Sequence, residues 1–337
     1  MKLSQLAAGS LVIDRNTKYN NATIVWRVLE QGHTGDPADS TTLMTKDLIT
    51  LKPFDGKEST NPNPYIQSYG YNRYSKSNIL QWLNSDAAAS EWYSAQHTYD
   101  APPSAANVYV ESGTALNPYQ TEAGFLSNFS VALKAALMSA TKTTVLSTND
   151  GGGSENVTSK VFMLSNTEVG FSNENGIAEG SLYSYFTSAT VRKMYLANNA
   201  AKGNYADAPD PCRWYLRTPS SSTANVVNYV GVNGDAGGSE SAYSGYIGIV
   251  PAICISNDID VSDTPDENGY YRLLFPPKIK KGYRGNSSNQ AVTIGAFKGY
   301  VGDSNDLSKS ILKAYVSYDG KAVAVEQPVE PKVYGAV

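Results

Sequence analysis

Hydrophobic residues near the start of the chain fall into short runs that predict strands. Leu11-Val12-Ile13 and the run from Thr23 to Leu29 stand on either side of the polar pair Asn20-Asn21. Short runs bounded by turn-forming residues are typical of strands. Residues 9–31 therefore predict two strands around a turn.

The following residues predict a second strand pair and then a loop. Leu43-Met44 and the run from Leu48 to Leu51 are short and apolar, and we expect them to form a further pair of short strands. Residues 55–75 are rich in Pro, Asn and Tyr. Because Pro and Asn favour turns, this stretch predicts a loop.

Three segments repeat apolar residues at three- and four-residue steps, which places them on one face of a helix. The first begins near Ser77, a candidate N-cap, the second spans residues 130–141, and the third follows Gly180-Ser181. Their apolar positions are, in chain order, Ile79, Leu80, Trp82 and Leu83, then Leu126, Phe129, Leu133, Ala136, Leu137 and Ala140, and then Leu182, Tyr185, Phe186, Ala189, Met194 and Tyr195. Between the second and third helices, residues 149–154 predict a flexible loop and residues 161–164 a short buried strand.

From Trp214 onward the pattern changes from helix to strand. Val230 and Val232 alternate with other residues, and Asn233-Gly234 is a dipeptide that two-residue hairpin turns favour. A returning strand is predicted from apolar residues at period two, namely Ile247, Ile249, Ile253 and Ile255. We therefore predict an α+β fold for a main domain at residues 1–262.

The C-terminal part contains a short repeat. Lys281-Gly282-Tyr283-Arg284-Gly285 recurs as Lys298-Gly299-Tyr300-Val301-Gly302 and as Lys313-Ala314-Tyr315-Val316-Ser317. Units this short hold one β-hairpin each and cannot bury a core alone. We predict a small all-β region at residues 276–337 that serves attachment or oligomerisation. Chance similarity among Tyr- and Gly-rich strands is the alternative.

Composition favours a polar but weakly charged, β-rich surface. Charged residues make up 17% of the chain, below the roughly 25% usual for soluble domains, and 24 tyrosines contribute to its polarity. Such a mixture is common in extracellular and viral structural proteins. The net charge is −4, and no stripe of basic residues is available to neutralise phosphate groups. This argues against nucleic acid as a partner.

The first ten residues lack the apolar core of a secretory signal, and no long apolar window predicts a membrane span. If the protein acts outside a cell, we expect it to leave as part of a particle. Cys212 and Cys254 match no metal-binding pattern and no redox motif. The two could bridge, but we favour two buried thiols in the core.

Residues 218–249 have an unusual composition. Ser, Asn, Gly and Tyr dominate, Lys, Gln, Met and Trp are absent, and Glu occurs once, at Glu240. Antibody binding loops use the same residues, because Tyr gives contact area at low entropic cost and Ser, Gly and Asn give adaptable hydrogen bonds. Apart from Glu240, every residue present can be reached by changing the adenines of an Asn codon. The segment thus indicates diversification by adenine mutagenesis, and an ordinary surface loop is the alternative.

The flanks of this segment resemble a known family. Cys212-Arg213-Trp214-Tyr215-Leu216-Arg217-Thr218-Pro219 precedes it, and Ile249-Val250-Pro251-Ala252-Ile253-Cys254-Ile255 follows it. Together with residues 69–84, 124–129 and 160–165, these motifs resemble the C-type-lectin-fold variable proteins of diversity-generating retroelements, many of them phage-encoded. The resemblance covers roughly residues 9–260.

The resemblance implies a C-type-lectin-like main domain in which a rigid framework displays a variable segment, residues 218–247. Trp214, Leu216 and Arg217 would belong to the framework. Val250 stands where such proteins often have Arg, so no framework salt bridge is expected there. The predicted ligand-binding residues are Ser220, Ser221, Ser222, Asn225, Asn228, Tyr229, Asn233, Asp235, Ser239, Ser241, Tyr243 and Tyr246.

The function indicated is therefore hypervariable receptor binding, without catalysis and without a cofactor. The expected ligand is a protein or glycan receptor on a bacterial surface, and the expected location is a virion, as part of a phage tail, or a bacterial cell surface. Other tail proteins are expected partners, as is a second copy in a homo-oligomer, whereas nucleic acid and membrane are not. Two alternatives stay open: a virion-associated glycosidase and a structural tail protein without a ligand.

The residues that a catalytic or metal site would need are sparse. His33 and His97 are the only histidines, and both stand in polar contexts that predict surface positions. Glu168 with Glu174 or Glu179 is the candidate carboxylate pair for a glycosidase, with solvated surface acids as the alternative. The acidic residues Asp258, Asp260, Asp263 and Asp266 would suit calcium, but a solvated turn is the favoured interpretation.

Overall fold

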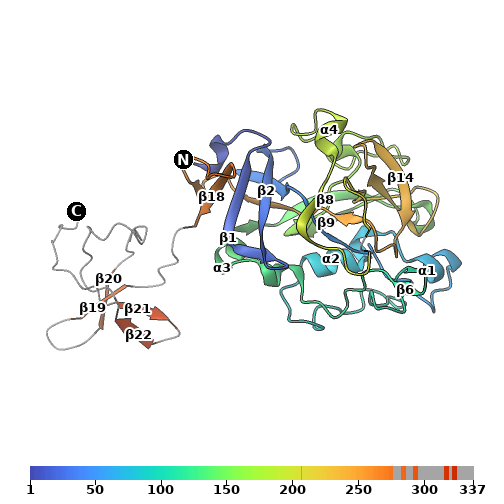
Figure 1. The fold of residues 1–337 in the computed structure, drawn as a ribbon, viewed down its shortest axis with the longest axis horizontal. Helices are drawn as coiled ribbons and strands as arrows, with labels where there is room; N and C mark the ends of the chain where they lie inside the picture. Colours follow the sequence, from blue (N-terminus) through green and yellow to red (C-terminus); the bar gives the residue numbers. More distant parts are fainter. Residues whose placement is uncertain (206, 276–281, 286–290, 295–314, 319–320, 325–337) are drawn as a thin grey trace. The chain divides into compact units, whose positions relative to one another are not determined.

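The computed structural model describes residues 1–205 and 207–275, and beyond them the backbone of four short strands at 282–285, 291–294, 315–318 and 321–324. Contacts within the chain divide it into two compact units, Met1–Phe275 and Pro276–Val337 (Figure 1). The first unit contains every residue for which a binding role is predicted, and it extends beyond residue 262 through one further strand, at Tyr270–Leu274.

Strands predominate in the first unit, and its helices are short. The strands are β1 (Leu11–Tyr19), β2 (Ala22–Gln31), β3 (Ser40–Thr45), β4 (Leu48–Leu51), β5 (Val110–Glu111), β6 (Thr114–Ala115), β7 (Leu137–Met138), β8 (Ala140–Val145), β9 (Ser154–Ser159), β10 (Val161–Phe162), β11 (Leu196–Ala201), β12 (Trp214–Pro219), β13 (Val226–Val230), β14 (Ala236–Ser241), β15 (Gly248–Ile249), β16 (Ala252–Ser256), β17 (Asp260–Val261) and β18 (Tyr270–Leu274). The α-helices are α1 (Pro64–Tyr69), α2 (Asn78–Leu83), α3 (Val131–Ala136) and α4 (Ala189–Arg192), and single 3-10 turns lie at Leu3–Gln5, Tyr74–Lys76, Phe125–Asn128, Thr148–Asp150 and Thr167–Val169. Helices and strands are thus mixed along the chain.

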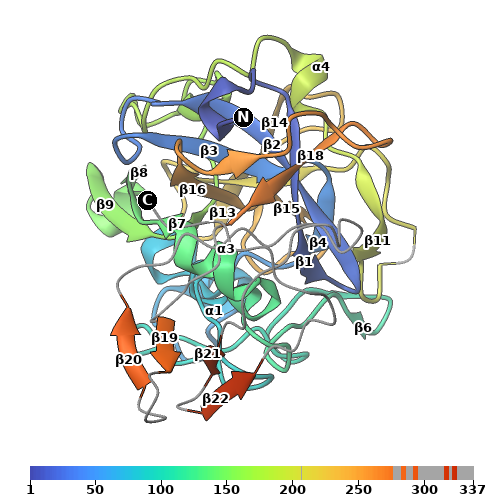
Figure 2. The same cartoon turned by 90° about the vertical axis from the view of Figure 1, so that its left-hand side faces the viewer.

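An eight-stranded sheet joins the two ends of the first unit. Its order is β10-β16-β3-β2-β1-β18-β17, with β7 paired to β16 outside this path. Neighbours run antiparallel except β1 and β18, which are parallel with Leu11 opposite Tyr270. Figure 2 shows β2, β3 and β16 close together in this sheet. Residues after 262 are therefore part of the same folded body as β1.

A six-stranded sheet carries the segment at residues 218–247. Its order is β11-β4-β15-β12-β13-β14, and β12, β13 and β14 form an antiparallel meander. The segment begins near the end of β12 and finishes just before β15. It therefore includes β14, which is an edge strand of this sheet.

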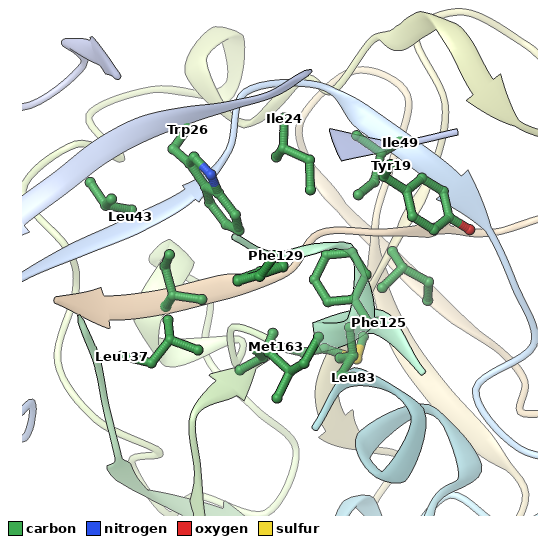
Figure 3. Close-up of a cluster of buried hydrophobic side chains, with 14 of the residues drawn as sticks. Tyr19, Ile24, Trp26, Leu43, Ile49, Leu83, Phe125, Phe129, Leu137 and Met163 are labelled. Atoms are coloured by element: carbon green, nitrogen blue, oxygen red, sulfur yellow. The ribbon is translucent and has the colours of Figure 1, made fainter. Parts of the chain in front are cut away.

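The larger core is rich in aromatic rings. Trp26 of β2 packs edge-on against Phe129 with ring centroids 5.7 Å apart, and Phe129 packs against Phe125 at 5.2 Å. Figure 3 shows these rings with Leu83 of α2 and Met163 beneath them. Edge-to-face contacts between buried rings add to the stabilisation that burial itself provides.

A second buried cluster lies against the six-stranded sheet and includes Trp214, Leu216 and Cys254. Cys212 belongs to the same cluster, and both cysteines are free thiols. The prediction of two buried thiols is confirmed. Burial raises the pKa of Cys212 to about 11 and that of Cys254 to about 12, because an apolar environment disfavours the thiolate.

Several local predictions are confirmed. The turn between β1 and β2 is Asn20-Asn21, and both residues have positive φ, 47° and 64°. Ser77 caps α2, since its hydroxyl accepts the Leu80 N–H at 3.3 Å. Ser130 caps α3 in the same way through Leu133 N–H at 3.0 Å. Side chains of this kind satisfy N–H groups that the first helical turn leaves free.

The predicted extents of the later helices are wrong. The helix expected at 130–141 ends at Ala136, because Leu137-Met138 is extended and pairs with β16 and the Thr-rich run after it forms β8. The helix expected after Gly180-Ser181 is reduced to α4, at Ala189–Arg192. Tertiary strand pairing overrides helical periodicity in the first case.

The predicted strand pairings after residue 40 need correction. β3 and β4 both form, but β3 pairs with β2 and β16 whereas β4 pairs with β11 and β15 in the other sheet. The run at 55–75 is not entirely a loop, since it contains α1, which begins after the N-cap Asn63. Short apolar runs identify strands without identifying their partners.

The hairpin at 230–236 has a longer connection than predicted. β13 ends at Val230 and β14 begins at Ala236, so Asn233-Gly234 lies inside a five-residue loop rather than forming the whole turn. The Gly231 N–H donates to Asp235 O at 2.9 Å and closes the loop. β14 is the returning strand. Of the isoleucines after it, Ile249 lies in β15, Ile253 and Ile255 lie in β16, and Ile247 lies just before β15.

The second unit contains β19 (Gly282–Gly285), β20 (Ala291–Ile294), β21 (Tyr315–Tyr318) and β22 (Lys321–Ala324) in the order β20-β19-β21-β22, all antiparallel. The first and third Lys-Gly-Tyr units overlap β19 and β21. The second, at 298–302, lies outside the described residues. Among the helices described here, none has the length and apolarity required to span a membrane.

Candidate functional site

The predicted binding residues lie on the β13–β14 hairpin and its flanks, where most are exposed to solvent and a few are buried. Nine of the twelve are at least partly exposed: Ser222, Asn233, Asp235 and Ser239 are exposed, and Ser221, Tyr229, Ser241, Tyr243 and Tyr246 are half-buried. The hairpin therefore displays most of the segment's polar and aromatic side chains.

The other three predicted residues, Ser220, Asn225 and Asn228, are buried. Asn225 accepts the Ala242 N–H through its carbonyl at 2.8 Å, and Asn72 donates to the neighbouring carbonyls of the same turn. These contacts hold the turn against the body of the unit. Ser220, Asn225 and Asn228 are only 5%, 6% and 8% exposed, so the structure does not support their assignment to ligand contact.

Five tyrosine rings form a continuous row beside this hairpin. Tyr243 packs edge-on against Tyr69 and against Tyr109, in each case with centroids 5.6 Å apart. Tyr109 contacts Tyr246 at 5.7 Å, and Tyr246 contacts Tyr205 at 6.0 Å. We call Tyr69, Tyr109, Tyr205, Tyr243 and Tyr246 the tyrosine band. Tyr69 is exposed and the other four are half-buried.

Backbone hydrogen bonds align the segments that carry these rings. The Tyr243 N–H donates to Tyr69 O at 3.0 Å, and the Tyr109 N–H donates to Tyr243 O at 2.9 Å. Gly245 stands where the chain passes close to Leu116, since a Cβ there would lie 2.1 Å from the Leu116 carbonyl oxygen. The close approach explains why glycine occupies this position between Tyr243 and Tyr246.

Burial favours the neutral form of three hydroxyl groups of the band, those of Tyr205, Tyr243 and Tyr246. Burial raises the pKa of Tyr243, and the neighbouring hydroxyls of Tyr69 and Tyr109 raise it further. Burial also raises the pKa values of Tyr205 and Tyr246. Near neutral pH each of these three rings therefore presents an apolar face and a hydroxyl that can both donate and accept a hydrogen bond.

A charged pair joins Arg213, just before β12, to Glu240 of β14. The Arg213 guanidinium stands over the Tyr229 ring, 5.1 Å from its centroid, and lies 3.9 Å from the Glu240 carboxylate. The Arg213 side chain is 45% exposed, so its charge is available to a ligand. Arg213 and Glu240 were not among the predicted binding residues.

Three members of the band come from outside the predicted segment. Tyr69 ends α1, Tyr109 precedes β5, and Tyr205 follows β11. The high tyrosine content was visible in the sequence, and Tyr69 belongs to one of the motifs that carry the family resemblance. Neither signal indicates that the three rings meet Tyr243 and Tyr246, because their contacts are long-range.

A buried ionic network underlies the strand that leads into the segment. Arg217 of β12 is fully buried and donates to the Glu168 carboxylate at 2.5 Å, to Met163 O at 2.8 Å and to Glu179 O at 2.7 Å. Lys142 Nζ contacts the other oxygen of Glu168 at 3.0 Å and also pairs with Asp36. A buried guanidinium with this many acceptors fixes β12 in place.

The same network binds Glu168 and Glu179, two of the carboxylates considered for a glycosidase pair. Glu168 is bound by Arg217 and Lys142, and the Glu179 carboxylate accepts from Thr218 Oγ1 at 2.5 Å and from Val145 N–H at 3.1 Å. Both residues are buried, so the alternative of solvated surface acids is wrong for them. Burial raises the pKa of Glu179, whereas the ion pairs outweigh burial at Glu168 and lower its pKa.

Glu174 lies apart from this buried pair, against the loop after β12. Its carboxylate accepts from the Ser221 N–H at 3.0 Å and the Ser221 hydroxyl at 2.8 Å. These bonds lower the pKa of Glu174. Glu174 thus anchors the loop that precedes β13.

The histidine predictions are also corrected. His33 is buried, stacks on Tyr183 with centroids 3.8 Å apart and pairs with Glu30 at 2.8 Å. His97 is half-buried, with Nε2 at 3.1 Å from the buried carboxylate of Glu58. Asp100 lies beside them, and in the part of the chain that the structure describes Glu58, His97 and Asp100 are the one group of three His, Cys, Asp or Glu residues whose possible ligand atoms all lie within 4.8 Å of one another.

The acidic stretch near residue 260 pairs with the start of the chain. The N-terminal ammonium contacts Asp263 at 2.6 Å, and Lys2 Nζ contacts Asp260 at 3.0 Å. Lys2 Nζ also donates to Asp258 O at 2.7 Å. These contacts give Asp260 and Asp263 cationic partners from the chain itself.

A family profile described as a domain of unknown function (DUF6273) matches residues 39–257. That range contains the whole tyrosine band, the segment at 218–247 and the buried ionic network apart from Asp36. No curated protein and no solved structure matches the chain.

Proposed function

The chain belongs to the DUF6273 family, and we propose that it is a ligand-binding protein whose contact surface is the tyrosine band together with the exposed residues of segment 218–247. The expected ligand is a protein or glycan on a bacterial surface. No chemical step is assigned to this surface, since its side chains are tyrosine, serine and asparagine with one Arg–Glu pair.

The observation that carries this proposal is the continuous row of rings. Five tyrosines from four separate segments meet at centroid distances of 5.6 to 6.0 Å, and all five keep some exposure to solvent. Adjacent rings already restrict one another, so a ligand that covers them costs little further side-chain entropy. Tyr is also enriched among the residues that dominate binding energy at interfaces.

The framework below the band favours a rigid display surface. Trp214, Leu216 and Arg217 are fully buried in β12, and the hairpin that follows carries the exposed Ser, Asn and Tyr side chains. A binding surface whose backbone is already ordered loses less free energy on association. A buried framework strand followed by a hairpin of exposed side chains supports the finer proposal of a C-type-lectin-like variable protein. Such a protein would be diversified by adenine mutagenesis and displayed on a phage tail or a cell surface.

A binding screen with a turnover control tests the function. Fluorescently labelled protein is applied to an array of bacterial surface polysaccharides and to immobilised bacterial surface proteins, and polysaccharide length is followed by gel filtration. We expect saturable retention on at least one component with no change in polymer length. Shortening of a polysaccharide would favour the glycosidase alternative, and absence of retention on both panels would count against receptor binding.

A further inference from the structure

Three side chains converge beside α1, in a region to which the binding proposal gives no role. An oxygen of Glu58, Nε2 of His97 and a carboxylate oxygen of Asp100 provide ligand atoms that all lie within 4.8 Å of one another. Glu58 comes from the segment after β4, whereas His97 and Asp100 come from the segment between α2 and β5. Two parts of the chain that are distant in sequence thus meet at these atoms.

Two of the ligand atoms, Glu58 Oε1 and His97 Nε2, are buried without a hydrogen bond. The Glu58 side chain is 0% exposed, yet its Oε1 has no hydrogen-bond partner, and His97 Nε2 also has none although the two atoms are 3.1 Å apart. The ion pair with His97 is thus the one interaction that Glu58 Oε1 has in place of water, and a buried carboxylate oxygen without a hydrogen bond is costly. A bound cation between these atoms would supply the missing interaction.

Other contacts hold the three side chains in position. The second carboxylate oxygen of Glu58 accepts from Asn61 Nδ2 at 2.5 Å. Asp100 accepts from the Gln96 N–H at 2.6 Å and from Asn78 Nδ2 at 3.1 Å. Hydrogen bonds of this kind orient the ligands of metal sites and fix the direction of their free lone pairs.

The surroundings carry an excess of carboxylates. Asp55 is completely buried a few residues before Glu58, and its oxygens accept the N–H groups of Asn78 at 2.9 Å and Tyr71 at 3.0 Å. Asn78 thereby links Asp55 to Asp100. Three carboxyl groups and one imidazole in a largely buried region favour the binding of a positive ion.

From this arrangement we propose that Glu58, His97 and Asp100 bind one divalent transition-metal ion. One imidazole nitrogen with two carboxylates suits ions such as Zn²⁺ or Mn²⁺, whereas Ca²⁺ prefers six to eight oxygen ligands. The His97 side chain is 20% exposed, so water can reach the ion and complete its coordination.

The ion would join the two segments that deliver part of the tyrosine band. The first segment continues from Glu58 into α1, which ends at Tyr69, and the second continues from Asp100 to Tyr109. The Lys57 N–H already donates to Asn107 O between these segments at 2.7 Å. The ion would therefore cross-link the two segments that carry Tyr69 and Tyr109. Its binding does not depend on the proposed ligand-binding function.

Isothermal titration calorimetry with ZnCl₂ on the chelator-treated full chain tests this site. We expect one ion bound per chain and a higher melting temperature in the presence of Zn²⁺. Glu58→Gln and His97→Ala should each weaken binding by at least about tenfold, since each removes a ligand. His33→Ala is the matched control, because it removes the only other histidine and should leave the Zn²⁺ affinity unchanged.

Circular dichroism and melting of the metal-free variants separate loss of binding from loss of fold. Glu58→Gln keeps the side-chain volume and removes a buried charge, so the metal-free variant should remain folded. Should it fail to fold, the half-buried position of His97 makes His97→Ala the decisive variant. Absence of Zn²⁺ binding by the wild-type chain, tighter binding of Ca²⁺ than of Zn²⁺, or unchanged Zn²⁺ affinity of His97→Ala would each overturn the proposal.

Discussion

Replacing Arg217 by methionine is expected to lower the free energy of unfolding by about 3–5 kcal/mol, the cost typical of removing one partner from a buried ion pair. The guanidinium is fully buried, and its loss leaves the Glu168 carboxylate with only Lys142 as a cationic partner. The carbonyls of Met163 and Glu179 also lose a donor. Urea unfolding followed by far-UV circular dichroism measures the effect.

Two further variants separate the ion pair from the simple loss of a long side chain. Arg15 is exposed on β1, so Arg15→Met should change the free energy of unfolding by less than about 0.5 kcal/mol. The double variant Arg217→Met/Glu168→Gln should lose less than the sum of the two single variants, because no unpaired buried charge is left. A loss below about 1 kcal/mol for Arg217→Met would show that the network is dispensable.

The same network has a predictable dependence on pH. Burial alone raises the pKa of Glu168, but Arg217 and Lys142 outweigh it, and the net pKa lies below the ordinary value of 4.5. A depressed pKa in the folded state stabilises the fold fully above that ordinary value and loses this contribution as the pH falls through the folded pKa. The stability difference between wild type and Arg217→Met should therefore shrink in acid.

The second large effect is expected on binding. Tyr243 is the ring that contacts both Tyr69 and Tyr109, so it stands inside the row rather than at its end. Tyr243→Ala should weaken binding to the component found in the screen by about 30-fold or more, which corresponds to the roughly 2 kcal/mol of a residue that dominates an interface. Tyr243→Phe keeps the ring and should lose much less.

Surface plasmon resonance on the immobilised component measures these affinities. Tyr195 is a matched control, because it is 50% exposed and belongs to no ring pair of the band. Tyr195→Ala should bind as the wild type does. Equal affinities for Tyr243→Ala and wild type, with both proteins folded, would place the contact surface elsewhere.

Helix caps and the tight turn between β1 and β2 were predictable, because residues adjacent in sequence determine them. Ser77 and Ser130 cap their helices, and Asn20-Asn21 forms the turn between β1 and β2, because in each case the side chain or the backbone of one or two residues suffices. Strand partners were not predictable. β3 and β4 are separated by two residues, yet they enter different sheets, since pairing is decided by segments far away in the sequence.

The candidate site was predictable in composition but not in geometry. The segment at 218–247 contributes Tyr243 and Tyr246 to the band, and its alternation cannot indicate that Asn225 and Asn228 turn inward. Tyr69 and Tyr109 meet Tyr243 only because backbone hydrogen bonds align three distant segments. Buried charges such as Glu168 and Glu58 look like surface acids in sequence, because their partners are equally distant.

Sequencing the locus that encodes this chain tests most directly whether the exposed residues of 218–247 form a diversified contact surface. The expected finding is a reverse transcriptase gene together with a near-copy of the codons for about Trp214 to Ile255, differing mainly at adenines. The differences should fall on codons of exposed or half-exposed residues such as Ser222, Asn233 and Tyr243, and not on those of the buried Trp214 and Leu216. Absence of both the gene and the copy, or differences spread evenly over buried codons, would contradict it.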